Sequence, residues 1–173
     1  MKRIWTHNYP KNIPYDISES KYKSIIDLFC ASVIKYKNKT AFKSFNSSLS
    51  FINTEKYSRI FASFLQNKLK IKKGTKIAIM LPNLITFPVA LFGTFFAGGI
   101  VVNVNPLFKK NELLDVLVDS EAEVIVVLDK FLNELEPIIE KTRIKNVIVC
   151  RIVDLLNPMM KIIINTVLFF KKE

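Results

Sequence analysis

Apolar residues recur at helical spacing twice in the first part of the chain. Residues 22–36 place five of them on one face, which predicts a helix with Ser20 as its N-cap: Ile25, Ile26, Phe29, Val33 and Tyr36. A second stripe predicts a helix that has Asn53 or Thr54 as its N-cap and ends near Lys68. We expect one face of this second helix to lie in the core: Tyr57, Ile60, Phe61, Phe64 and Leu65.

The segment between these two helices favours a β-hairpin. Residues 40–45 and 48–52 have the length and composition of short strands, and they flank Asn46-Ser47. The proline-spaced lead before the first helix shows no regular pattern. We therefore divide the first part of the chain into an irregular lead (1–21) and a helix-hairpin-helix entry segment (22–72).

From residue 73 onward, short apolar runs alternate with longer helical stretches. The predicted strands are 76–81, 100–104, 124–128 and 146–150, and the helices between them are 84–97, 111–120 and 131–141. Strands separated by such helices need crossover connections, which make the sheet parallel and place helices on its faces. The sequence therefore predicts an α/β fold, with a parallel β-α-β subdomain over residues 73–151.

The stretch 77–108 has no charged residue and is long enough in principle to cross a bilayer. Pro82-Asn83, Gly98-Gly99 and Asn105-Pro106 divide it into pieces that are each too short to span. A strand, a helix and a second strand buried in a parallel sheet explain the same hydrophobicity. We therefore predict no membrane span here, and the polar lead predicts no signal peptide.

The apolar tail over residues 152–173 leaves three interpretations open. It is a core helix whose partners lie in further sequence, an interfacial helix with lysines near lipid headgroups, or a disordered end. We favour the first, because about a dozen apolar residues occur there without a stop signal. Polar or helix-breaking residues interrupt the apolar run at Asn157-Pro158, Lys161 and Asn165.

The composition adds a strong positive charge. Lysine and arginine total 26 against 15 acidic residues, which gives a formal charge of +11. Such an excess favours contact with phosphates, nucleic acid or an anionic membrane surface, although lysines on solvated faces produce the same number. Because no run of basic residues forms an arm or a stripe, we predict no nucleic-acid partner.

The cysteines and the single histidine suggest no special chemistry. Cys30 and Cys150 lie far apart in apolar stretches, which favours free, buried thiols in a reducing cytoplasm. His7 has no neighbouring residues at the spacing of metal ligands. The sequence therefore predicts neither a disulfide nor a metal site.

No catalytic set emerges from the acids and hydroxyls. Paired acids on a predicted amphipathic helix are typical of its solvent-facing side, and this applies to Glu112 with Asp115 and to Asp119 with Glu123. The serines of the predicted hairpin, at positions 44, 47 and 48, have no histidine at a useful spacing. We therefore assign no catalytic, cofactor-binding or metal-binding residue.

Three stretches, in register over about residues 1–150, carry a family resemblance. The first comprises Lys2-Arg3-Ile4-Trp5, Tyr9-Pro10, Ile13-Pro14 and residues 22–29. The second is 72–83 followed by 87–93. The third is 97–107, in which a glycine pair leads into a strand and an Asn-Pro turn. In these stretches the chain resembles the bacterial long-chain fatty acyl-CoA synthetases of the adenylate-forming superfamily.

The resemblance implies an enzyme that uses ATP and Mg²⁺ to convert a fatty acid into an acyl-adenylate and then transfers the acyl group to coenzyme A. The family's phosphate loop, rich in Ser, Thr and Gly and ending in Lys-Gly, does not occur in this sequence. The acidic residues that hold magnesium and ribose and the small C-terminal domain are also not among the 173 residues. We therefore expect the N-terminal portion of a long-chain fatty acid–CoA ligase that is inactive by itself and holds no cofactor.

Two other functions remain open on the sequence. A noncatalytic membrane-surface or subunit-association module would use the positive charge and the apolar tail. A self-standing nucleotide binder would need a Gly-x-Gly-x-x-Gly or phosphate-loop motif, which the sequence lacks.

The expected partners are the remainder of the ligase, a second copy of the chain, or an anionic membrane surface. The expected location is the cytoplasm, with a peripheral place at the inner membrane. Because parallel strands need cover on both faces, we also predict a soluble chain that is prone to aggregate or self-associate.

Overall fold

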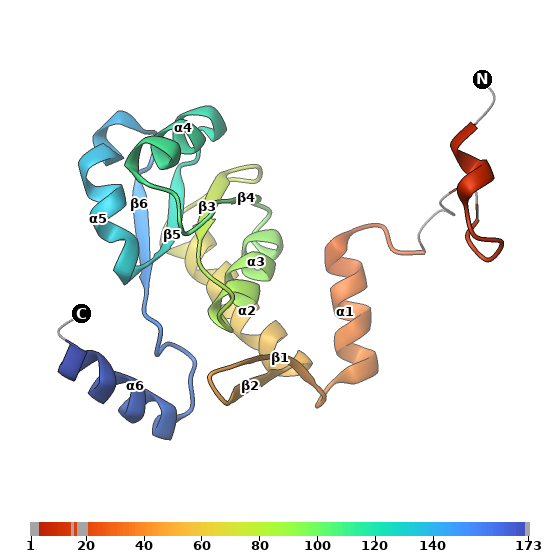
Figure 1. Ribbon diagram of the computed structural model, residues 1–173, viewed down its shortest axis with the longest axis horizontal. Helices are drawn as coiled ribbons and strands as arrows, with labels where there is room; N and C mark the ends of the chain where they lie inside the picture. Colours follow the sequence, from red (N-terminus) through yellow and green to blue (C-terminus); the bar gives the residue numbers. More distant parts are fainter. Residues whose placement is uncertain (1–3, 15, 17–20, 172–173) are drawn as a thin grey trace.

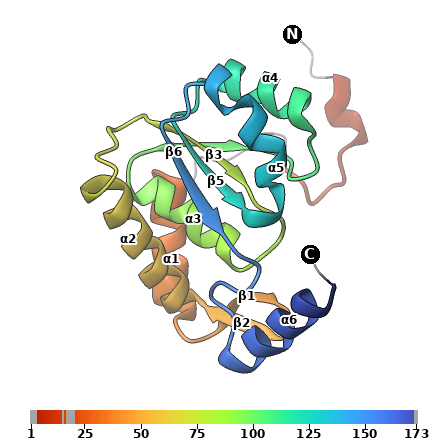
Figure 2. The same cartoon turned by 90° about the vertical axis from the view of Figure 1, so that its left-hand side faces the viewer.

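The computed structural model describes residues 4–14, 16 and 21–171, and its centre is a four-stranded parallel sheet (Figures 1 and 2). The strands are β3 (Lys76–Met80), β4 (Ile100–Asn103), β5 (Val124–Leu128) and β6 (Asn146–Cys150), in the order β4-β3-β5-β6. Ile77 pairs with Val101 on one side and with Val124 on the other. The predicted α/β fold and all four strands are confirmed, with ends within one residue of the expectation.

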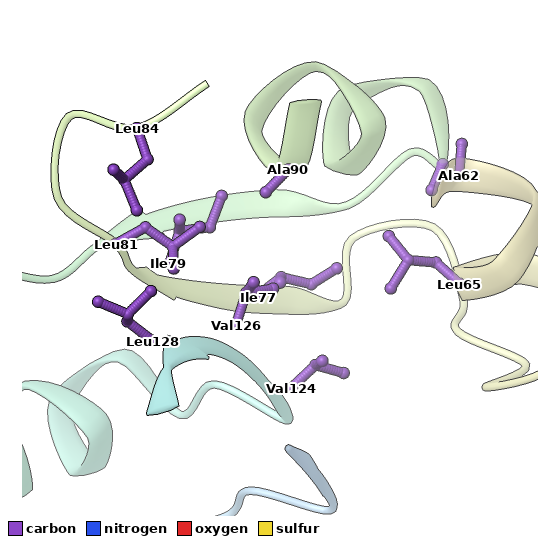
Figure 3. Close-up of a cluster of buried hydrophobic side chains, with 11 residues drawn as sticks. Ala62, Leu65, Ile77, Ile79, Leu81, Leu84, Ala90, Val124, Val126 and Leu128 are labelled. Atoms are coloured by element: carbon purple, nitrogen blue, oxygen red, sulfur yellow. The ribbon is translucent and has the colours of Figure 1, made fainter. Parts of the chain in front are cut away.

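Helices cover both faces of this sheet (Figures 1 and 2). The helices α2 (Phe51–Asn67) and α3 (Thr86–Phe96) lie on one face, and α4 (Lys110–Ser120) and α5 (Leu132–Leu135) lie on the other. Because side chains alternate along a strand, Ile77 and Ile79 of β3 point toward α2 and α3, while Ala78 and Met80 point toward α4. Figure 3 shows the first of these two cores, where Ala62 and Ala90 meet the strands.

The charge-free stretch 77–108 forms β3, α3 and β4, as the sequence predicts. The inner strands β3 and β5 are buried on both faces, which explains their continuous hydrophobicity. Within the described part of the chain, no helix is long and apolar enough to cross a membrane.

The hydroxyls that cap the first two helices differ from the predicted ones. Helix α1 (Ile25–Tyr36) begins after Ser24, whose Oγ accepts the Asp27 N–H at 3.0 Å. The predicted cap Ser20 lies outside the described residues. The prediction of Asn53 or Thr54 as the next cap is wrong, because α2 begins at Phe51 and the Ser50 hydroxyl accepts the Asn53 N–H. The second strand of the hairpin runs directly into this helix without a loop.

The hairpin itself is confirmed, with shorter strands than expected. Its strands are β1 (Thr40–Ser44) and β2 (Ser47–Ser50), and they pair antiparallel. Phe45 and Asn46 form the turn with positive φ angles of 47° and 55°. The predicted second strand extended to Ile52, which instead belongs to α2.

The aromatic stripe predicted as the core face of α2 is only partly buried. Leu65 is fully buried, but Ile60 and Phe64 are exposed. The face that lies in the core carries smaller side chains: Thr54, Ser58, Ala62 and Leu65. The reason is the close approach of α3, where Gly93 lies against the backbone of Ser58. Small residues let two helices approach closely, and large aromatic ones do not.

Two buried threonines on these helices differ in their hydrogen bonds. The Thr54 hydroxyl donates to the Ser50 carbonyl at 2.8 Å, whereas the Thr94 hydroxyl has no hydrogen-bond partner among the described residues. Both side chains are fully buried. We expect Thr94→Val to leave the free energy of unfolding unchanged or to raise it by up to about 1 kcal/mol, because a buried hydroxyl without a partner is destabilising.

Thr54→Val is the matched control for this prediction. It removes the hydroxyl that donates to the Ser50 carbonyl. We therefore expect it to lower the free energy of unfolding by about 1 kcal/mol. Urea unfolding followed by circular dichroism measures both variants. If both variants lowered the free energy of unfolding equally, the assignment of Thr94 as a buried hydroxyl without a partner would be contradicted.

The prediction of one continuous α-helix over residues 131–141 is wrong. The segment forms a 3₁₀ turn (η2, Asp129–Phe131), the short helix α5, and a second 3₁₀ stretch (η3, Glu136–Lys141). Pro137 lies at the start of η3 and has no N–H to continue the α-helical hydrogen bonds. The segment still covers the sheet through buried Leu135 and Ile138.

The tail forms a helix, α6 (Pro158–Lys171), after a short connection from β6. The connection is anchored by buried Val153 and Leu156, and the Asn157 N–H donates to the Ser47 hydroxyl of the hairpin at 3.1 Å. Asn157 also caps α6, since its Oδ1 accepts the Met160 N–H at 2.8 Å. Of the three interpretations of the tail, the two helical ones remain.

Candidate functional site

The order of the strands indicates where a ligand would bind. The chain passes from β3 to β4 on one side and then returns across β3 to β5 on the other side. In open parallel sheets, ligands bind outside the carboxyl ends of the strands where the winding direction changes. Here this point lies between β3 and β5, next to residues 81–85 and 129–131.

The carboxyl edge of the sheet carries a small hollow. Phe42 and Lys43 of the hairpin line it together with the loop after β3, and its volume is about 190 Å³. Ligand pockets usually reach about 300–1,000 Å³. Asp129 also follows β5 at this edge, and its Oδ1 accepts the Lys130 N–H at 2.8 Å. The edge therefore offers an apolar wall with a lysine beside it, without a nucleophile and base in contact.

The glycine pair of the third sequence stretch shapes the backbone, as predicted. Gly98 has a φ angle of 79°, which glycine adopts readily. A Cβ on Gly99 would lie 3.0 Å from Thr94 Cγ2 and 3.2 Å from the Thr75 carbonyl oxygen, so the helix and the strand pack closely there. In the turn that follows, Asn105 Oδ1 accepts the Leu107 N–H at 3.0 Å. These residues shape the connections on either side of β4.

The amino edge of the sheet holds a cluster of ion pairs that the sequence did not reveal. Glu121 pairs with Arg143 at 2.9 Å and with Lys76 at 3.6 Å, and Glu123 pairs with Lys145 at 2.5 Å. The hydrogen bond from Lys145 is the main cause that lowers the pKa of Glu123, and Arg143 adds to it. Both acids are therefore occupied in joining the starts of β3, β5 and β6.

Two hollows of about 450 and 460 Å³ lie beside these ion pairs and share Gly74, Glu123 and Lys145. Their walls are strongly basic, and the turn before β3 is held by the Thr75 hydroxyl, which accepts the Lys72 N–H at 3.1 Å. The hollows are large enough for a ligand, but their two acids are paired with bases. Neither acid is free in this structure to act as a general acid or base.

The acids and hydroxyls that the sequence analysis set aside have structural roles or face solvent. Glu112 accepts the Lys109 N–H at 3.0 Å and so stabilises the start of α4. Asp115 and Asp119 are exposed on the same helix. Ser47 is buried and bonded to Asn157. No group of three metal-ligating side chains occurs in the part of the chain that the structure describes.

The two cysteines are free thiols, and both are half-buried rather than fully buried. Burial raises the pKa of the Cys150 thiol to about 11, and the carboxylates of Asp154 and Asp129 add to this. Burial also raises the pKa of Cys30. A nucleophilic cysteine needs a lowered pKa, so neither residue is suited to that role.

We expect iodoacetamide to modify Cys150 slowly in the folded chain. At about pH 8 a thiol with a pKa near 11 has roughly a hundredth of the thiolate of an ordinary cysteine. Mass spectrometry of the cysteine peptides measures the rate, and Cys150→Ser verifies the peptide assignment. In urea, both cysteines should react at similar rates. Fast modification of Cys150 without unfolding would contradict the burial.

The chain is similar in sequence to known proteins. The family model described as AMP-binding enzyme matches residues 29–165. The long-chain-fatty-acid–CoA ligase of Escherichia coli O6:H1 is 41% identical over all 173 residues, and that of Haemophilus influenzae is 40% identical. The chain spans 31% of the length of each of these relatives and matches their N-terminal part.

Solved structures agree with the sequence matches. A long-chain-fatty-acid–CoA ligase from Archaeoglobus fulgidus superposes with a TM-score of 0.72 at 27% identity, over 83% of this chain and 30% of that one. A benzoate CoA ligase from Burkholderia xenovorans superposes with a TM-score of 0.68 over 79% of this chain and 27% of that one. At 20% identity, the second likeness concerns the fold alone.

Proposed function

The chain belongs to the AMP-binding enzyme family, and on this premise we propose that it is the first part of a long-chain-fatty-acid–CoA ligase. The observation that carries the proposal is the 41% identity over all 173 residues to a ligase of which the chain spans 31%. In the proposed reaction, the fatty acid carboxylate attacks the α-phosphorus of ATP and releases pyrophosphate. The coenzyme A thiol then displaces AMP from the acyl-adenylate.

We assign these 173 residues a scaffolding role in that reaction. Among the described residues, the two acids at the amino edge are paired with bases, and burial raises the pKa of both thiols, so none of these groups has the surroundings of a nucleophile or a general base. The transferred phosphates and Mg²⁺ need backbone donors, a lysine and acidic ligands close together. The proposed chemistry therefore requires residues that correspond to the other two thirds of the relatives, and the chain alone should not turn over.

The proposed partner is the polypeptide that corresponds to those remaining residues, and β6 is the proposed place of contact. Strand β6 is the outermost strand on its side of the sheet. Val147 and Val149 are exposed on the face that α4 and α5 cover elsewhere. An apolar edge strand with unpaired backbone groups favours addition of another strand or a covering segment. The same edge supports the predicted tendency to self-associate.

A chimera tests the proposed function directly. The 173 residues replace the matching residues of the Escherichia coli O6:H1 ligase, and ATP–pyrophosphate exchange is measured with a long-chain fatty acid. We expect exchange by the chimera and none by the isolated chain above a no-enzyme control. Exchange by the isolated chain would contradict the scaffolding role.

A folded but inactive chimera would contradict the ligase assignment, so its folding must be checked separately. Circular dichroism and size-exclusion chromatography serve this purpose. A chimera with Leu117→Asp is the negative control, because it places a charge in the core beneath α4. It should lose both fold and exchange.

A further inference from the structure

Basic side chains outnumber acidic ones around the two hollows at the amino edge of the sheet. The hollows share Gly74, Glu123 and Lys145, so the ion pair of Glu123 with Lys145 forms part of the wall of both. We name the two hollows together the amino-edge basin. Its acidic lining residues are Glu121 and Glu123, and its basic ones are Lys70, Lys72, Lys73, Lys76, Arg143 and Lys145. The basin therefore carries an excess of positive charge.

The two acids of the basin are already paired and do not neutralise the rest of it. Glu121 pairs with Arg143 at 2.9 Å, and Glu123 pairs with Lys145 at 2.5 Å. Lys145 is the main cause that lowers the pKa of Glu123, and Arg143 and Lys72 add to the effect. Cations from both hollows therefore act on the same carboxylate, and a ligand beside it would meet them together.

Three lysines of the basin form no ion pair with another described residue. These turn lysines are Lys70, Lys72 and Lys73, and all three are exposed in the connection from α2 to β3. The backbone of this connection is fixed, because the Thr75 hydroxyl accepts the Lys72 N–H at 3.1 Å and the Gly74 N–H donates to the Gly98 carbonyl at 2.8 Å. A ligand therefore meets the turn lysines on an ordered backbone, which lowers the entropic cost of binding.

The size and lining of the basin favour an anion with several charges along a chain. Each hollow, at about 450 and 460 Å³, has the volume of a small-molecule site. Lysine ammonium groups bind phosphate oxygens as point charges, and the arginine adds a forked set of donors. None of the described lining residues is aromatic, so the basin has no platform on which a nucleobase would stack. The chemistry fits the phosphates of a ligand rather than a base.

We propose that the amino-edge basin binds a linear oligophosphate, with the turn lysines and Arg143 contacting its phosphate oxygens. The chain comes either from an inorganic oligophosphate or from a nucleoside triphosphate. The inference goes beyond the proposed function and does not depend on it, because the family's phosphate loop is not among these 173 residues. Binding of a phosphate chain by the isolated protein therefore reports on the basin.

Isothermal titration calorimetry with the whole chain tests this inference. Tripolyphosphate and inorganic phosphate are titrated without Mg²⁺ at the same ionic strength of about 0.1 M. We expect tripolyphosphate to bind at least roughly tenfold more tightly and to lose most of its affinity at about 1 M salt. Equal affinities for the two anions would overturn the proposal, because a chain of phosphates would then have no advantage.

ATP without Mg²⁺ distinguishes the two sources of the phosphate chain. We expect it to bind within about threefold of tripolyphosphate, since the basin has no stacking platform. Tighter binding of ATP would identify a nucleotide as the source and weaker binding an inorganic chain, and both results support the proposal. Displacement of ATP by adenosine would overturn it, because the base would then hold the ligand.

A double variant of the turn lysines locates the site. Lys70→Gln with Lys72→Gln should raise the dissociation constant for tripolyphosphate at least roughly tenfold, because it removes two charged donors. The matched control, Lys56→Gln with Lys161→Gln, removes two exposed lysines of α2 and α6. It should leave the dissociation constant within about twofold. Equal losses of affinity in both double variants would overturn the proposal, because net charge alone would then explain the binding.

Circular dichroism verifies that the variants are folded, and Lys73→Gln is a single substitution at the same turn that serves if the double variant unfolds. It should raise the dissociation constant roughly threefold or more. A single-stranded oligonucleotide tests the other class of polyanion. If it binds and tripolyphosphate does not displace it, the basin is a nucleic-acid surface and the proposal is overturned. These titrations need no turnover, so their failure is distinguishable from a failure of the proposed function.

Discussion

Leu117→Ala should lower the free energy of unfolding by about 2–5 kcal/mol, the largest loss that we expect from a single truncation. Leu117 is completely buried in the core between α4 and the sheet, in the same cluster as Met80 and Ile125. The loss combines the removed apolar contacts with the cavity left between a helix and strands that cannot collapse fully. Because small domains are stable by only about 5–15 kcal/mol, this variant should unfold at much lower urea concentration.

The neighbouring residue provides the control for this prediction. Val118 lies on the same helix and is 51% exposed. Val118→Ala should change the free energy of unfolding by no more than about 0.5 kcal/mol. Urea unfolding followed by circular dichroism compares both variants with the unchanged chain. If both variants lowered the free energy of unfolding by a similar amount, α4 would not pack on the sheet through Leu117.

Gly93→Ala should lower the free energy of unfolding by about 1–3 kcal/mol, although alanine normally stabilises a helix by about 1 kcal/mol relative to glycine. A Cβ at this position of α3 would lie 2.7 Å from Phe61 Cδ1 and 2.8 Å from the Ser58 carbonyl oxygen. The Phe61 ring can rotate, but the Ser58 carbonyl is part of the α2 backbone. The two helices must therefore move apart, and their shared core opens.

A second glycine distinguishes this contact from backbone strain. A Cβ on Gly74 would meet nothing within 4 Å, but its φ angle of 86° is unfavourable for alanine. Asparagine tolerates positive φ angles better, so Gly74→Asn should be less destabilising than Gly74→Ala. At Gly93 the order should reverse, because asparagine is the larger residue. Thermal unfolding of the four variants decides between the two causes, and the same order at both positions would contradict the helix contact.

The parts of the fold that depend on local pattern were predictable. The four strands are short apolar runs rich in valine and isoleucine, and they appear within one residue of their predicted ends. The helix caps were less predictable, because Ser24 and Ser50 compete with other hydroxyl residues a few positions away. Pro137 was visible in the sequence. Its effect on the predicted helix over 131–141 follows from the missing N–H, which the apolar spacing alone does not reveal.

The structure adds surroundings to the residues that the sequence analysis set aside. The serines, acids and thiols set aside from the sequence have structural roles, exposed positions or a raised thiol pKa in the fold. The ion pairs of Glu121 and Glu123 at the amino edge were not predicted, because these acids precede β5, whereas Lys76 begins β3 and Arg143 and Lys145 precede β6. No short-range pattern brings these residues together.

The sequence by itself determined that the chain forms a parallel α/β layer, and its three stretches pointed to the family that the comparisons show. These conclusions rest on spacing and motifs within short segments. Only the tertiary structure decided the strand order, the small-residue face that α2 buries against Gly93, and which side chains of α6 are exposed. The physical reason is that each of these depends on which distant segments pack together, and a helix with apolar residues on several sides does not specify its own buried face.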